Sequence, residues 1–94
     1  MANNKGNDMQ TIKTKYLGAT NHRGSRIKAT TSSGISKTMS YDYSLNQVPN
    51  HVKVAKELIK ELGWSGEYAM GSDGYSGDGY VFVNTDDSLV KISI

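Results

Sequence analysis

Side chains that commonly carry catalysis are few in this chain. Its 94 residues include two histidines and no cysteine, so the chain offers no thiolate nucleophile and no zinc site with cysteine ligands. His22 falls in a glycine-containing break and His51 in a helical segment, and no motif places a nucleophile or an orienting carboxylate beside either. Glu57 and Glu61 lie one helical turn apart, where solvated carboxylates are the rule. We therefore predict no catalytic site, no metal and no cofactor, and expect a protein that is not an enzyme.

The glycine-rich segment 71–79 (GSDGYSGDG) is the other stretch whose composition suggests chemistry. A phosphate-binding loop needs a lysine after its last glycine and a helix that follows it, and both are missing here. Asp73 and Asp78 do not have the spacing of a calcium loop. The segment is therefore predicted to be the tip of a hairpin, with a mobile protein-contact loop as the alternative.

Positive charge is concentrated in the first half of the chain. The net charge is +2, but residues 1–47 carry +5 and residues 48–94 carry −3. No acidic residue lies between Lys13 and Thr38. Such asymmetry is typical of a surface that binds a phosphate backbone or an acidic protein. The alternative is that an exposed sheet face simply needs polar residues, and that lysines protect sheet edges from aggregation.

Alternation in two segments, 10–17 and 25–30, predicts half-buried strands that position these charges. Apolar residues alternate with cations in both, so the pleat places one set toward a core and the other toward solvent. The core set is Ile12, Tyr16, Ile27 and Ala29, and the solvent set, which we term the basic face, is Lys13, Lys15, Arg26 and Lys28. The break at 18–24 carries Arg23 and His22 at one end of that face.

A third strand is expected at 35–41, with Met39 and Tyr41 on one side, and the three strands read as an antiparallel meander. Tyrosine is favoured at interfaces because it provides a large contact area at little entropic cost. Tyr43 and Tyr75 are expected to be exposed, and Tyr43 is a candidate anchor beside the basic face. The other strand tyrosines, Tyr16, Tyr41 and Tyr80, are predicted to belong to the sheet or core.

The period changes to that of an amphipathic helix at 49–62. Either Pro49 occupies its first turn or Asn50 caps it, and Gly63 ends it. Trp64 is expected to fold back on the sheet as a core anchor. The apolar positions of the helix are Val52, Ala55, Leu58, Ile59 and Leu62.

Three closing strands are predicted at 67–70, 80–84 and 89–94, the second of them central in the sheet because it is almost entirely apolar. The fold class is thus α+β: a single antiparallel sheet in the order β-β-β-α-β-β-β with one amphipathic helix packed on one face. Residues 1–9 are predicted to be a disordered lead-in and 10–94 one domain. A bare edge strand at the end of the chain would allow a homodimer.

Three stretches, IKTKYLGATNHRGSRIKAT (12–30), YDYSLN (41–46) and GYVFV (79–83), resemble a family of small uncharacterised proteins carried by bacterial phages, plasmids and prophages. The element order is also similar to that of some small anti-CRISPR proteins. The resemblance implies a setting on a mobile element and no particular activity.

The function expected from these features is binding of a macromolecule. The first hypothesis is an inhibitor that binds a host defence protein or ribonucleoprotein complex through Lys13, Lys15, Arg23, Arg26 and Lys28, with Tyr43 beside them. The alternatives are a small DNA- or RNA-binding module that uses the same face and a virion structural or assembly protein. No apolar run is long enough to span a membrane and no export signal is evident, so the bacterial cytoplasm is the expected location.

Overall fold

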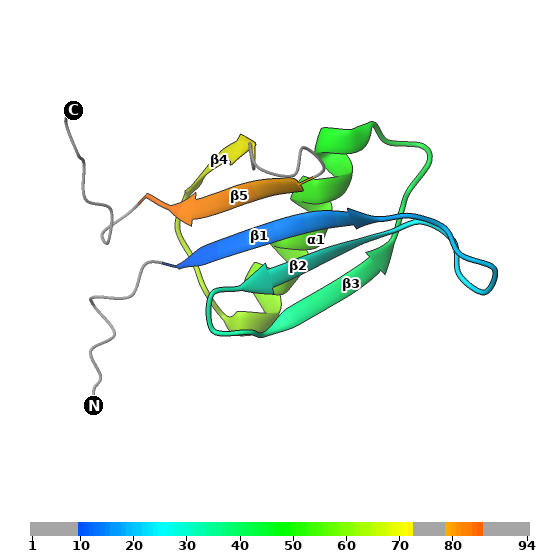
Figure 1. Ribbon diagram of the computed structural model, residues 1–94. Helices are drawn as coiled ribbons and strands as arrows, with labels where there is room; N and C mark the ends of the chain where they lie inside the picture. Colours follow the sequence, from blue (N-terminus) through cyan, green and yellow to red (C-terminus); the bar gives the residue numbers. More distant parts are fainter. Residues whose placement is uncertain (1–9, 73–78, 86–94) are drawn as a thin grey trace.

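A single antiparallel sheet and one helix make up the part of the chain that the computed structural model describes, residues 10–72 and 79–85 (Figure 1). The fold is therefore α+β, as predicted. The five strands follow each other in the sheet as β3-β2-β1-β5-β4. Their bounds are β1 Thr11–Leu17, β2 Arg26–Thr31, β3 Ser36–Ser40, β4 Tyr68–Ser72 and β5 Gly79–Asn84, and the helix is α1 Gln47–Leu62.

The strand order explains why β5 is the most apolar strand. β5 pairs with β1 on one side and with β4 on the other, so the prediction of a central position is confirmed. The predicted meander β1-β2-β3 is also confirmed. Of the predicted hairpin tip at 71–79, Gly71 and Ser72 belong to β4 and Gly79 belongs to β5. Its residues 73–78, the predicted lead-in and the predicted last strand, with the homodimer based on it, lie outside the described residues.

The core lies between the helix and one face of the sheet. Ile12, Ile27 and Ala29 are 0% exposed, so the predicted assignment of the sheet faces is confirmed. Tyr16 lies on the same side but is 37% exposed, and its hydroxyl makes a hydrogen bond of 2.7 Å with that of Ser25. The remaining core residues are Val54, Ala55, Leu58 and Phe82.

The helix begins two residues earlier than expected. Asn46 occupies the N-cap position with extended backbone, without a side-chain capping bond, and Pro49 lies in the first turn. The alternative that Asn50 caps the helix is wrong, since Asn50 lies inside the helix and is 1% exposed. Gly63 ends the helix at φ 73°, a left-handed conformation that favours glycine. Trp64 is partly buried and packs against the core, as predicted.

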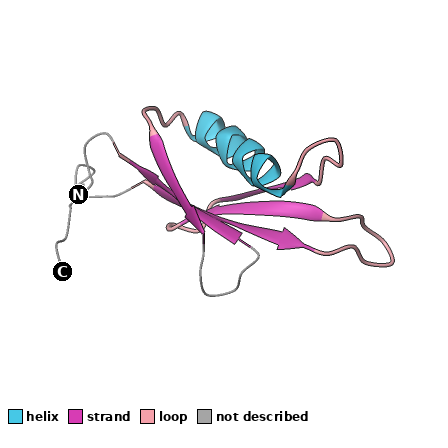
Figure 2. Cartoon of the chain, turned by 90° about the horizontal axis from the view of Figure 1, so that it is seen from above, coloured by secondary structure: helices cyan, strands magenta, loops and turns pink. Residues whose placement is uncertain are grey.

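No described residues form a layer over the other face of the sheet, the one opposite α1 (Figure 2). On the core face of the sheet, α1 packs mainly against β1, β2 and β3. Among the described residues no helix is long and apolar enough to cross a membrane.

Candidate macromolecule-binding face

The pairing of β1 with β2 brings the predicted cations together on the uncovered side of the sheet. Lys15 lies directly opposite Lys28, while Lys13 and Arg26 lie one level away on either side, opposite Thr30 and Leu17. Residues two apart in a strand are separated by about 6.8 Å, so the four cations span about 14 Å along the strands. Lys13, Lys15 and Lys28 are exposed, and Arg26 is partly buried.

The neighbouring strands surround these cations with uncharged side chains. β3 places its hydroxyl residues beside β2, with Thr38 opposite Lys28 and Ser40 opposite Arg26. On the other flank, Val81 lies opposite Lys13. None of the strand residues that point to this side is acidic, and Glu67 precedes β4, which is two strands away from β1. Among the residues that the structure describes, the centre of the face therefore presents positive charge and hydroxyl donors and no carboxylate.

On the helix side of the sheet three lysines are arranged differently, because each has an acidic partner. Lys37 binds Glu61, which bridges β3 and α1. Lys53 lies 3.4 Å from Asp42, and Lys60 lies 3.7 Å from Glu57. In the part of the chain that the structure describes, no such ion pair involves a cation of the basic face. Four of the seven cations of the first half of the chain are therefore presented on the uncovered face.

An ordered loop carries Arg23 at the end of the basic face. The hydroxyl of Thr20 accepts hydrogen bonds from the backbone N–H groups of His22 and Arg23, at 3.2 and 3.0 Å. The Thr20 N–H in turn donates to the Arg23 carbonyl at 2.7 Å. Arg26 Nε donates to the Gly24 carbonyl at 3.2 Å, which directs this guanidinium toward the loop. Arg23 thus lies in a loop held by these hydrogen bonds, and this loop joins β1 to β2 at one end of the sheet (Figure 1).

Tyr43 lies at the same end of the sheet but on its helix side. Its ring packs on that of Tyr41, with the ring centroids 5.1 Å apart. The ring of Tyr41 in turn meets that of Tyr16 edge to face, with the centroids 5.8 Å apart. Tyr41 N–H donates to the Ser25 carbonyl at 2.9 Å, which joins this aromatic group to the loop that holds Arg23. Tyr43 is 77% exposed, as expected. The structure therefore places Tyr43 near the Arg23 loop and apart from the four strand cations.

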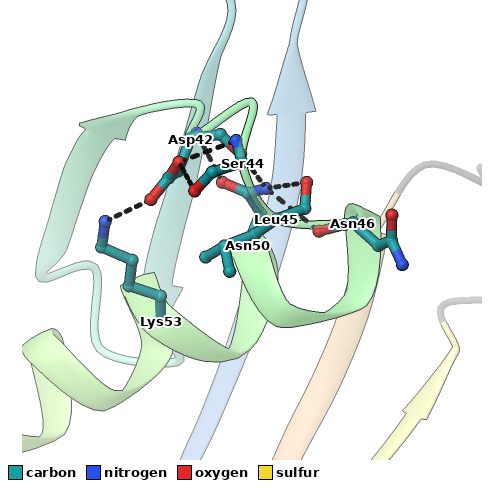
Figure 3. A network of polar contacts seen from close by, with 6 residues as sticks. All are labelled: Asp42, Ser44, Leu45, Asn46, Asn50 and Lys53. Atoms are coloured by element: carbon teal, nitrogen blue, oxygen red, sulfur yellow. Dashed lines mark hydrogen bonds and ion pairs between the residues drawn. The ribbon is translucent and has the colours of Figure 1, made fainter.

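A polar network holds the loop that carries Tyr43 (Figure 3). Asn50 accepts a hydrogen bond from Asp42 N–H at 2.7 Å, and its amide donates to the Asp42 carbonyl at 2.9 Å. The same amide also donates to the carbonyls of Leu45 and Asn46, at 3.2 and 3.0 Å. Such local bonding satisfies backbone groups that precede a helix and are left unpaired there. The loop conformation, and with it the position of Tyr43, depends on one buried amide.

The carboxylate of Asp42 extends this network toward the surface. Ser44 donates to Asp42 Oδ1 through its hydroxyl at 2.6 Å and its N–H at 3.0 Å. The hydroxyl bond is the main reason that the pKa of Asp42 lies below its ordinary value of 3.8; the N–H bond and nearby Lys53 act in the same direction.

The two histidines differ in their exposure to solvent. His22 is exposed in the loop, whereas His51 is 0% exposed on α1. His51 Nδ1 and the Thr14 hydroxyl are 2.7 Å apart, and the His51 ring meets that of Tyr80 at 4.7 Å. His51 lies three, four and seven residues before Val54, Ala55 and Leu58, so it belongs to the buried stripe of the helix. The predicted stripe was placed to one side of it, since Val52, Ile59 and Leu62 are only partly buried. Among the described residues no group of three or more His, Asp or Glu side chains could hold a metal ion.

Comparison of the chain with protein-family models, with curated proteins and with solved structures found no significant match. The resemblance to proteins of phages, plasmids and prophages therefore stays a prediction.

Proposed function

We propose that this chain is a non-enzymatic binding protein whose basic face contacts the phosphate backbone of a nucleic acid. The observation that carries the proposal is the direct opposition of Lys15 and Lys28 on an uncovered face without a strand carboxylate. Like charges directly opposite each other destabilise a sheet, and a bound polyanion would relieve that repulsion. The hydroxyl residues of β3 add donors of the kind that contact phosphate oxygens.

The composition of the face also favours contacts to the backbone over recognition of bases. Proteins that recognise single-stranded RNA on a sheet stack bases on aromatic rings. The strand residues on this face include no aromatic one, and the tyrosines of β1 and β5, Tyr16 and Tyr80, point to the helix side. We therefore expect affinity that depends weakly on nucleotide sequence and strongly on salt.

The test compares two variants that lose the same charge from opposite sides of the sheet. One replaces Lys13, Lys15, Arg26 and Lys28 by Ser, and the control replaces Lys37, Lys53, Lys56 and Lys60 by Ser. For the native chain and the control, log K for a labelled DNA duplex should fall with log salt at a slope of about −3 to −4, since about 0.9 is expected per neutralised phosphate. The basic-face variant should lose this binding while its circular dichroism spectrum is unchanged. Equal weakening of both variants would contradict the proposal, because the effect would then follow net charge alone.

A second candidate partner is a host defence protein or ribonucleoprotein complex, which the chain would inhibit by covering its interaction surface. Tyr43 favours it, since an exposed ring packed on a second ring and close to an arginine loop resembles the anchors of protein interfaces. Capture from bacterial lysate, with and without nuclease, separates the two candidates. A defined complex that survives nuclease and is lost in Tyr43→Ser would support the inhibitor. Only nuclease-sensitive, salt-labile material would exclude it.

A further inference from the structure

An apolar groove runs between the helix and the outer two strands, on the side of the sheet opposite to the basic face. It exists because α1 packs mainly against β1, β2 and β3 and leaves β4 and β5 less covered. The groove has a volume of about 560 Å³ and is lined by Phe82 of β5, by Tyr68 and Met70 of β4, and by Ile59 of α1. Trp64, just after the helix, also lines it.

The apolar lining is accessible. Met70 is 36% exposed, and Trp64, Tyr68 and Ile59 are all partly exposed. Sites for small molecules usually occupy about 300–1,000 Å³, with a mainly apolar lining and few polar groups.

The charged residues that line the groove are both lysines. Lys56 and Lys60 lie one turn apart on α1, and both are exposed. Lys60 is 3.7 Å from Glu57, an exposed pair of the kind that contributes little. Lys56 makes no ion pair within residues 10–72 and 79–85. Among residues 10–72 and 79–85 no carboxylate lines the groove, so the charge that these residues bring to it is complementary to an anionic group.

We propose that this groove binds one amphipathic carboxylate with a chain of about ten carbons, since its volume of about 560 Å³ falls within the usual range of small-molecule sites. The chain would lie against Trp64, Met70 and Phe82, and the carboxylate would lie at Lys56 and Lys60. This site is independent of the basic face, since the two lie on opposite sides of the sheet.

Trp64 is the only tryptophan in the chain, so its fluorescence reports directly on the groove. The full chain is titrated with decanoate below its micelle-forming concentration, and with decanol as the uncharged control. Decanoate should shift the Trp64 emission to shorter wavelength in a saturable way and bind about tenfold more tightly than decanol, because its head group forms charge-assisted hydrogen bonds. Replacement of Lys56 and Lys60 by Ser should reduce decanoate affinity to that of decanol, whereas Lys53→Ser should not. Met70→Asp should weaken both ligands, with circular dichroism as the check of folding.

Several outcomes would overturn this proposal. The proposal fails if Trp64 emission does not respond to decanoate, or if decanoate and decanol bind with equal affinity. It also fails if only micelles or anionic vesicles change the emission. Finally, it fails if acrylamide cannot quench Trp64 because the chain itself covers the groove. The variant without the basic face should bind decanoate as the native chain does, so this test and that of nucleic-acid binding can fail separately.

Discussion

Asn50 shows at the scale of one residue how a polar side chain can be required inside a small core. It is 1% exposed and makes four hydrogen bonds, all to backbone groups of the segment from Asp42 to Asn46. A buried amide is tolerated because its donors and its acceptor are satisfied. The result is a rigid connection between β3 and α1 that fixes the exposed ring of Tyr43.

Asp42 makes this connection sensitive to acid. Its pKa is lowered by the bonds from Ser44, so the ionised carboxylate stabilises the folded state. That contribution is complete above the unfolded value near 3.8 and is lost as the pH falls through the lower folded value. Asp42→Asn should therefore flatten the dependence of Tm on pH below about 4. The effect is expected to be small because the group is exposed.

The pKa itself is measured by NMR titration of the Asp42 carboxyl carbon. Ser44→Ala removes the largest cause of the shift, so the pKa of Asp42 should rise in that variant. A pKa at or above 3.8 in the native chain would contradict the bonding of this carboxylate to Ser44.

At the scale of the elements, β1 and β5 approach each other closely at Gly79. Gly79 begins β5 and pairs with Lys15, although its sequence context suggested the end of a flexible loop. A Cβ atom at this position would overlap the backbone oxygen of Thr14. Only glycine allows the two strands to approach this closely, so the residue belongs to the sheet as much as to the hairpin.

Gly79→Ala should lower the free energy of unfolding by about 1–3 kcal/mol, since the added methyl group must push β5 away from β1. Gly24→Ala is the matched control, because a Cβ atom there would meet no other atom within 4 Å and the φ angle of Gly24 is not positive. That change should stay within about 0.5 kcal/mol. Urea denaturation of both variants measures the difference, and equal effects would mean that β1 and β5 do not approach this closely.

The whole molecule separates its charges between its two sides. Paired charges lie on the helix side, where Lys37, Lys53 and Lys60 each have an acidic partner. The four cations of the basic face lie on the uncovered side without an ion pair among the described residues, with Lys15 and Lys28 opposite each other. This arrangement costs stability, because like charges directly opposite each other repel.

A stability measurement tests that view of the whole molecule. Lys28→Thr removes the repulsion with Lys15 and introduces a residue that suits strands, so the free energy of unfolding should rise by about 0.2–1 kcal/mol. Duplex affinity should fall in the same variant. Lys53→Thr, which removes a cation paired with Asp42, should not stabilise the chain. If Lys28→Thr destabilises the domain, Lys28 has a structural role that the basic face does not explain.

Local patterns in the sequence determined the elements and their faces. The alternation of Ile12 with Lys13 and Lys15, the three-four spacing from Val52 to Leu62, and Gly63 as the helix end are all short-range features. They predict the fold class because the side-chain period of an element depends only on its own backbone.

The tertiary structure decided which distant residues meet, because pairing depends on the register of strands and on where the helix lies. It placed β5 between β1 and β4, joined Lys15 to Lys28, and buried His51 against Thr14. It also moved Tyr43 to the helix side of the sheet and opened the groove beside Trp64. The apolar run of β5 predicted an interior strand. The partners in these contacts do not follow from local periodicity, since each contact joins segments far apart in the chain.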